Sequence, residues 1–445
     1  MRKITKLLLS CLSVVALTST CISCSSPFIF INESDLENYV PFKDTQNSLF
    51  FALYNYYGQD GQHFTNRWLG MKDALANHGI TVTGDSYEKD AKKFKIAREA
   101  DCDLPEDTLI YMVNNQTWDP SLQFTKPLTR SKPVAVISTC NGVEFASAQI
   151  KANSRGTQNA TMGGFSTNYY NAFKDHSLNY LAAKYSCHIA PIFAAGVNAV
   201  RGNPLRTEKN EALQLSVSHW DITSLEKYEE YKSIDLVKDN PTIKKANLDA
   251  FFTPGSPLNS AEELKKWCAK STFEDIKEIY DNNRDVVDTK ATGEKVKVGL
   301  LVPGSINDTV QAYIDYISGY LADVYNCEML VKEEITSKDD QVKACIAMID
   351  KGAQLIISLQ DDTNRNAAIA EANKNGVYFA NAGTCQNNSD YALTKDYEYF
   401  VGSIGSSIDE ERRATRDMTE YYIQKIIDRA NGIDITITEE TEVEE

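Results

Sequence analysis

Short apolar runs alternate with helix-like segments along the first half of the chain. The runs have the length of buried strands, whereas residues 64–78 place Trp68, Met71 and Leu75 at the spacing of one helix face. Alternation of strand and helix in this way predicts a doubly wound parallel sheet. The predicted strands are residues 48–54, 80–83, 108–113 and 133–138, and the predicted helices are residues 64–78 and 89–100.

The same order of segments returns after residue 295. Gly70 aligns with Gly319, and the pair Thr139-Cys140 aligns with Thr384-Cys385. We therefore expect two similar α/β lobes, with two unrelated α/β domains as the alternative. The predicted strands of the second copy are residues 296–302, 328–332, 354–359 and 377–381, and its helices are residues 310–325, 338–351, 365–375 and 410–427.

The middle of the chain differs from both copies. The last helix of the first copy is predicted at residues 172–186, and after it the apolar run 188–195 predicts a further strand of the first lobe. Residues 222–283 are charged and helical in pattern, with prolines as breaks. Whether residues 188–290 complete a lobe is left open. The expected division is a signal peptide at 1–23, a tether at 24–47, a first α/β lobe at 48–221, a helical insertion and linker at 222–295, a second α/β lobe at 296–431 and an acidic tail at 432–445.

The N-terminus has the pattern of a secretory signal. Arg2 and Lys3 precede an apolar run at residues 7–17, which is too short to span a membrane. The following residues, CISCSS, resemble a bacterial lipobox, and this resemblance implies cleavage before Cys24 and attachment of diacylglycerol and palmitate there. Cys21 stands where such motifs prefer Leu, so an ordinary cleaved signal is the alternative. We expect an extracytoplasmic protein held to the bacterial cell membrane by lipid alone.

Composition and charge narrow the class of partner. The chain has 445 residues, of which 42% are apolar and 24% charged, as in ordinary globular proteins of two to four domains. With 46 basic and 62 acidic side chains, its net charge is −16. An acidic surface disfavours nucleic acid and anionic lipid as partners.

Motifs for catalysis and for metal binding are missing from the sequence. The five histidines have no HxxxH or HExxH spacing, and there is no GxSxG, P-loop or GxGxxG motif. We therefore expect no enzyme activity, no metal and no cofactor. Cys140 and Cys385 follow predicted strands, where a nucleophile would sit, but their loops hold no histidine. No CxxC pair occurs among the ten cysteines, and we expect most of those beyond Cys24 to be small buried apolar residues.

The second copy resembles type I periplasmic binding proteins, a family of two-lobed solute receptors that often stand, lipid-anchored, beside an ABC importer. The resemblance is carried by VKVGLLVPGSINDTVQAYIDYISGYLAD, then KACIAMIDKGAQLIISLQDDTNRNAAIAEANKNGVYFANAG, then YFVGSIGSSIDEERRATRDMTEYYI. Gln354 and Tyr378 depart from the Asp and Pro that are usual in the family. The first copy resembles it loosely, and residues 173–183 are similar to a helix of the basic-membrane-protein branch, whose members bind nucleosides.

This resemblance implies a solute-binding protein in which two lobes close on a small polar solute, such as a sugar or nucleoside. The solute would pass to an ABC permease or be reported to a sensor. The alternative, from another class, is a surface interaction or structural lipoprotein that keeps the fold without a pocket and uses residues 222–283 as its contact surface. An enzyme is the third alternative.

Candidate ligand contacts follow the carboxyl ends of the predicted strands, where open α/β sheets bind their ligands. Their amides, hydroxyls and carboxylates would bond a polar solute, and their aromatic rings would cover its flat face. Each has a structural alternative, because Asn and Asp are common helix N-caps and Tyr or Trp can serve in packing or turns. The candidates are Tyr56, Tyr57, Asn114, Asn115, Trp118, Thr139, Asn141, Ser305, Asn307, Asp308, Gln360, Asp361, Asp362, Asn381 and Thr384.

Overall fold

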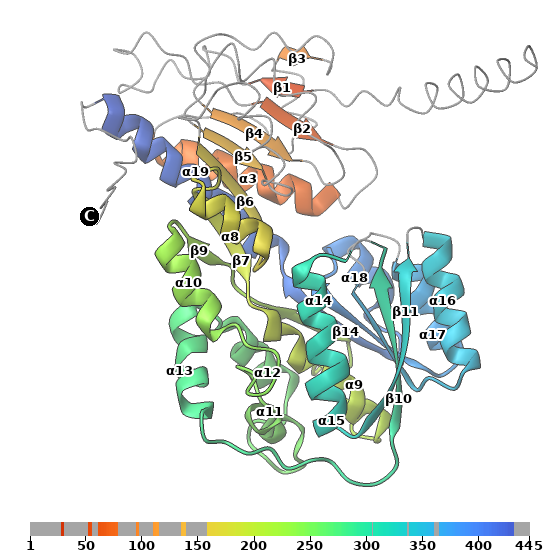
Figure 1. Cartoon of the computed structure of the whole chain (residues 1–445). Helices are drawn as coiled ribbons and strands as arrows, with labels where there is room; N and C mark the ends of the chain where they lie inside the picture. Colours follow the sequence, from red (N-terminus) through yellow and green to blue (C-terminus); the bar gives the residue numbers. More distant parts are fainter. Residues whose placement is uncertain are drawn as a thin grey trace, which may run out of the picture.

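The computed structural model describes two sheets stacked end to end, with helices on their faces (Figure 1). The described residues are 28–30, 52–55, 61–78, 95–97, 110–114, 135–138, 158–304, 306–335, 338–359 and 365–430. Both sheets have a parallel centre, which confirms the predicted α/β class with two parallel-sheet lobes.

The first sheet has the strand order β3-β1-β2-β4-β5-β6-β7-β9 in the described residues. The run from β2 to β7 is parallel. At its edges β1 pairs antiparallel with β2 and β9 pairs antiparallel with β7, and β3 pairs antiparallel with β1. Its strands are β1 (Phe28–Phe30), β2 (Ala52–Asn55), β3 (Lys95–Ala97), β4 (Ile110–Asn114), β5 (Ala135–Ser138), β6 (Gln158–Gly164), β7 (Tyr180–Lys184) and β9 (Trp220–Ile222).

The second sheet has the order β11-β10-β12-β13-β14-β8, and all its pairs are parallel. Its central strands are buried on both faces, as expected for strands that helices cover on both sides. The strands are β8 (Leu213–Ser216), β10 (Val296–Pro303), β11 (Cys327–Ile335), β12 (Leu355–Ser358), β13 (Tyr378–Thr384) and β14 (Phe400–Ser406).

Helices cover both sheets. The long C-terminal helix α19 returns to the first lobe and lies along α3, so both ends of the described chain meet there. The helices are α3 (Gly61–Asn77), α8 (Thr167–Lys174), η3 (Ser186–Ile189), α9 (Ala190–Val200), α10 (Leu225–Ile234), α11 (Lys245–Phe252), α12 (Ala261–Ala269), α13 (Phe273–Asn283), α14 (Asp308–Asp315), the π-helix η4 (Tyr316–Leu321), α15 (Ala322–Val324), α16 (Lys338–Asp350), α17 (Arg365–Lys374), α18 (Asn388–Thr394) and α19 (Ile408–Ala430).

The chain crosses between the sheets several times. After β7 it enters α9, which packs on β12, β13 and β14, and β8 then becomes the edge strand of the second sheet. It returns through β9, leaves again after α13, and comes back a last time between β14 and α19. Residues 186–216 thus contribute to the second sheet, although the sequence suggested that they belong to the first lobe. How the chain divides into independently folding units stays a prediction.

The four helices α10–α13 are part of a shared core. Their buried side chains, among them Leu248, Phe251 and Leu264, belong to one apolar cluster with Trp220 and with residues of β10, β12 and β14. Figure 1 places these helices below the first sheet and beside the second. The predicted helical character of residues 222–283 is confirmed, and their apolar faces help to hold the second sheet.

The strands and helices predicted for the second copy are found in the predicted order, and α18 is an additional helix that the sequence did not predict. Several first-copy predictions were wrong. The apolar run 188–195 lies in η3 and α9, because burial on every side suits a helix as well as a strand. The predicted helix 172–186 is the end of α8 followed by β7, and Lys95–Ala97 is a strand within the predicted helix 89–100. Phe28–Phe30, within the predicted tether, forms β1.

Candidate functional site

The carboxyl ends of strands from the two sheets face each other and touch at several points. Beyond β6, the Thr167 N–H donates to Asp308 Oδ2, which follows β10, at 2.6 Å. At the end of β7, Lys184 Nζ donates to the Gly383 carbonyl of β13, also at 2.6 Å. Since ligands of open α/β sheets bind at such edges, these contacts mark the margin of a candidate site between the lobes.

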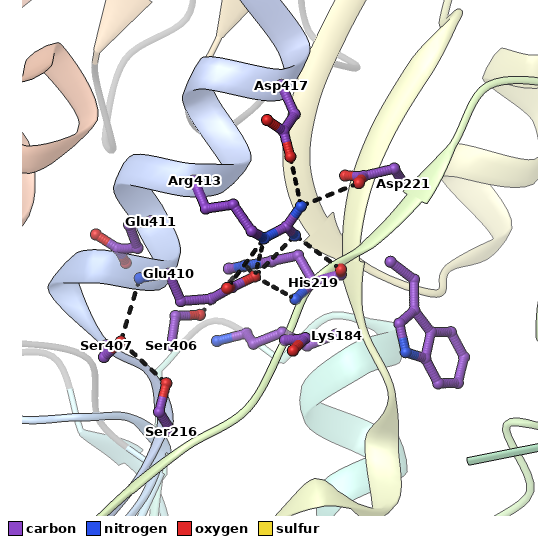
Figure 2. A network of polar contacts seen from close by, with 12 residues as sticks. Lys184, Ser216, His219, Asp221, Ser406, Ser407, Glu410, Glu411, Arg413 and Asp417 are labelled. Atoms are coloured by element: carbon purple, nitrogen blue, oxygen red, sulfur yellow. Dashed lines mark hydrogen bonds and ion pairs between the residues drawn. The ribbon is translucent and has the colours of Figure 1, made fainter. Parts of the chain in front are cut away.

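A polar network joins two of the crossings between the sheets, as Figure 2 shows. We call His219, Ser406, Glu410 and Arg413 the hinge network. His219 lies between β8 and β9, and its backbone N–H donates to Glu410 Oε1 at 2.7 Å. Its ring Nδ1 lies 3.3 Å from the same oxygen, and its Nε2 lies 3.1 Å from Ser406 Oγ, at the end of β14. The second crossing, between β8 and β9, and the last, between β14 and α19, are thereby held side by side.

Arg413 extends the network along α19. Its guanidinium donates to both oxygens of Glu410, to Asp417 Oδ2 at 2.7 Å and to Asp221 Oδ2 at 3.1 Å. It also donates to the His219 carbonyl oxygen at 2.9 Å. One side chain therefore links the start of α19 with β9 of the first sheet (Figure 2).

Burial and charge fix the protonation of the hinge network. Burial alone would raise the pKa of Glu410, but His219 and Arg413 outweigh it and hold that pKa at about 2. Burial lowers the pKa of the His219 imidazole, although Glu410 acts in the opposite direction. At neutral pH the carboxylate is therefore charged and the ring neutral, with Nδ1 donating to Glu410 and Nε2 accepting from Ser406.

A second buried ion cluster joins α3 to α19. The Glu411 carboxylate accepts from Arg67 Nη2 at 3.0 Å and from His63 Nδ1 at 2.7 Å. His63 Nε2 lies 3.2 Å from the Cys385 carbonyl oxygen, so both ring nitrogens donate and the imidazolium form satisfies both acceptors. Burial would raise the pKa of Glu411, but Arg67 and His63 together bring it far below its ordinary value. His63 thus links the first lobe to the end of β13.

Most of the sequence-predicted contacts lie outside the described residues or their described side chains. Only the backbone of Asn114 is described, at the end of β4. The others of this group stay predictions: Tyr56, Tyr57, Asn115, Trp118, Thr139, Asn141, Ser305, Gln360, Asp361 and Asp362, together with the lipidation candidate Cys24.

Four predicted contacts have described side chains. Asn307 caps α14, because its side chain accepts from the Val310 N–H at 3.0 Å, as the helix-cap alternative had it. Asp308 makes the contact between the lobes with Thr167. Asn381 is fully buried on β13, and Thr384 ends that strand. The structure brings Asn381 and Thr384 to one edge, and ligand binding by any of the four stays a prediction.

Described cysteines behave as small apolar residues. As the sequence predicted, Cys187, Cys268, Cys327, Cys345 and Cys385 are buried, and all five are free. Burial raises the pKa of the Cys385 thiol to about 12, and its Sγ donates to the Leu215 carbonyl oxygen at 3.0 Å. A thiol in that state is a poor nucleophile.

The hinge network was missed by sequence reasoning. Its members are far apart along the chain, and the one local hint was the acidic first turn of α19, which any helix N-terminus favours. Within the described part of the chain, no helix is both long and apolar enough to cross a membrane. The same residues contain no cluster of three or more His, Cys, Asp or Glu with metal-binding geometry.

Comparisons with known proteins find structural likeness without sequence likeness. No protein-family model matches the chain, and no curated protein matches its sequence. A glucose-galactose binding protein from Geobacillus stearothermophilus is similar at a TM-score of 0.42 and 9% identity, over 88% of this chain and 94% of that one.

Two further solved structures are similar to the chain. A periplasmic solute-binding protein of an ABC transporter from Actinobacillus succinogenes, with bound D-allose, has a TM-score of 0.42 at 9% identity. The match covers 87% of this chain and 92% of the Actinobacillus protein. A LacI family transcriptional regulator from Enterococcus faecium, with bound ribose, has a TM-score of 0.40 at 10% identity. The match covers 84% of this chain and 89% of the regulator. The assignment of two α/β lobes rests on the sheet topology of the chain itself.

Proposed function

We propose that the chain is a lipid-anchored, extracytoplasmic solute-binding protein. Two lobes close on a small polar solute, which is handed to an ABC permease or reported to a sensor. The observation that carries the proposal is the meeting of strand ends from both sheets, seen in the pairs Thr167 with Asp308 and Lys184 with Gly383. A site of this kind needs preorganised polar groups and a hinge, and no catalytic group.

In this proposal the hinge network is the point about which the two lobes rotate. His219 and Glu410 hold two crossings together, so a rotation of the lobes would turn about this point and separate the strand ends. Asp308 accepts from an N–H of the opposite lobe, and that bond would break on opening. The carboxylate and the first turn of α8 then act as a latch on the closed form.

Ligand screening tests the proposal. Thermal-shift and calorimetric screening against sugars, nucleosides, amino acids and their anionic derivatives is expected to find a solute that stabilises the chain. X-ray scattering is expected to give a smaller radius of gyration with that solute. If no solute in the panel stabilises the chain and the scattering does not change, the interaction-protein alternative replaces the receptor.

The latch can be tested separately. Asp308→Ala removes the acceptor for Thr167 and is expected to shift the ligand-free chain towards an open form, with a larger radius of gyration. Asp315→Ala is the control, because Asp315 lies on the same helix, pairs with the exposed Lys238 and accepts from Gln311 of its own helix. Equal scattering from both variants would contradict the role of Asp308 as a latch.

Lipid attachment has its own experiment. We expect labelled palmitate to enter the chain when it is expressed in a bacterium, and expect Cys24→Ala to abolish the label and release the protein from membranes. Cys21→Ala is the matched control, because it alters a neighbouring cysteine without removing the proposed acceptor. Label retained in Cys24→Ala would disprove the assignment.

A further inference from the structure

Polar side chains form a buried row across the central strands of the second sheet, level with the end of β12. Ser358 on β12 lies beside Asn381 on β13, and Asn381 lies beside Ser403 on β14. Two residues earlier, Phe379 packs with Ala368 and Ile369 of α17, so Asn381 lies on the sheet face that α17 covers. Since α17 begins at the carboxyl ends of the strands, Asn381 lies near its first turn.

Some polar atoms of this row have hydrogen-bond partners, and others have none. Gln341 of α16 donates from Nε2 to Ser358 Oγ at 3.0 Å, and Ser403 Oγ accepts from the Gln386 N–H at 3.1 Å. Asn381 has no partner for Oδ1 or Nδ2, and Gln341 has none for Oε1. Among the described residues, Asn381 is the one side chain with two buried polar atoms that both lack a partner. Buried polar groups are nearly always bonded, so these atoms point to a ligand.

Positive charge gathers at the same edge. Arg365 is the first residue of α17, is only 3% exposed, and donates from Nη1 to the Thr384 carbonyl oxygen at 3.3 Å. No carboxylate pairs with it in the part of the chain that the structure describes. Lys184 Nζ donates to the preceding carbonyl, that of Gly383. Two cations therefore lie on consecutive carbonyls, next to the positive end of the α17 dipole.

We propose that this strand-end cluster, composed of Gln341, Ser358, Arg365 and Asn381, binds the anionic group of the solute. Arg365 would bond a carboxylate or phosphate, the Asn381 amide N–H₂ would donate to it, and Oδ1 would accept from a neighbouring hydroxyl. The inference rests on the proposed function, and it narrows the solute to a small molecule that carries an anionic oxygen group.

Matched neutral and anionic probes test this. Calorimetry with glucose, glucuronate and glucose 6-phosphate, and with adenosine and adenosine 5′-monophosphate, is expected to give at least tenfold tighter binding for an anionic member, and affinity that falls as salt rises. The glucuronate and phosphate arms tell carboxylate from phosphate recognition. Equal or tighter binding of the neutral members would overturn this inference and leave the receptor standing. Failure of every solute in the wider screen would overturn both.

Variants assign the effect to the cluster. Arg365→Gln and Asn381→Asp are each expected to weaken binding of the anionic probe at least tenfold, the first by removing a positive charge and the second by adding a negative one. Arg284→Gln is the matched control, since Arg284 is exposed at the C-terminal end of α13 and pairs with Asp281. Because Arg365 is buried, circular dichroism is used to check that each variant folds. If Arg365→Gln does not fold, the test rests on Asn381→Asp, which keeps the shape of the side chain. Unchanged affinity in a folded Asn381→Asp variant would refute the proposal.

Discussion

Two buried polar regions of this protein are satisfied in opposite ways. In the hinge network and the adjoining Glu411 cluster, both oxygens of Glu410 and of Glu411 are bonded to donors, and each carboxylate accepts from at least one other element. In the strand-end cluster, the amide of Asn381 is equally buried and has no partner. Completed bonds hold a conformation, whereas open ones are costly unless something binds them. The difference separates a part of the molecule that supports its structure from a part that is ready for a ligand.

Removing one partner from the completed region should have the largest effect. Glu411→Gln leaves Arg67 and His63 buried beside a neutral amide, and we expect it to lower the free energy of unfolding by about 3–5 kcal/mol. Urea denaturation measures this loss. Asp73→Asn is the control, because Asp73 pairs with Arg412 across the same two helices but is half-exposed, and should cost about 0–1 kcal/mol. Equal losses would mean that burial does not distinguish the two pairs.

Packing in the same interface gives the next largest effect. A Cβ at Gly70 on α3 would lie 2.1 Å from the Arg412 carbonyl oxygen of α19, so Gly70→Ala should force the helices apart and cost about 1–3 kcal/mol. Gly319, its counterpart in the second copy, has no described atom within 4 Å of such a Cβ. Gly319→Ala should therefore stabilise the chain by about 0.5–1 kcal/mol, and thermal unfolding of the two variants should shift in opposite directions.

How far the sequence predicts this fold depends on the periodicity of each segment. The strands and helices after residue 295 were predicted well because strand runs and amphipathic helices differ clearly there. The segment containing α9 was predicted as a strand because it is apolar on every side, and Pro191 in its first turn was the available sign of a helix. Crossings such as β8 into the second sheet have no local pattern, since pairing is decided by tertiary contacts.

The candidate site was predicted only by the rule of strand ends. That rule selected Asn381 and Thr384, which the structure brings to one edge, but it did not select Arg365 at the start of the next helix. The hinge network was beyond prediction, because His219 and Glu410 meet only after the chain has crossed between the sheets twice. Which buried polar atoms stay unpartnered depends on side-chain packing, which a single sequence does not reveal.

Acid should weaken the region around the first crossing. Burial, helped by the charge of Lys184, lowers the pKa of His188 to about 3, against an ordinary value of 6.5. The unfolded chain therefore binds a proton that the folded chain does not, and the free energy of unfolding falls as pH drops from 6.5 towards 3, by up to about 1.4 kcal/mol per pH unit.

His188→Phe should remove this dependence. The ring stays between Tyr185 and Tyr313, while the titrating nitrogens are lost. Denaturation between pH 6.5 and 5, above the range in which carboxylates titrate, should give a flatter slope than in the parent chain. His176→Asn is the control, because His176 is exposed and Asn tolerates its positive φ of 60°. An unchanged slope in His188→Phe would place the acid sensitivity elsewhere.

At Asn381 we expect a small effect that stabilises the chain. Asn381→Leu removes an amide that has no partner, so in the absence of solute we expect it to raise the free energy of unfolding by about 1 kcal/mol. Gln386→Met is the comparison, because Gln386 is buried nearby, donates from Nε2 to Asn366 at 3.1 Å and accepts from Thr394 at 3.2 Å, so its loss should destabilise. Paired measurements with solute should then show that Asn381→Leu loses the stabilisation that solute gives the parent chain. If both substitutions destabilise the chain to the same extent, Asn381 has a structural role in the core. The contrast between the completed network and the strand-end cluster would then be wrong.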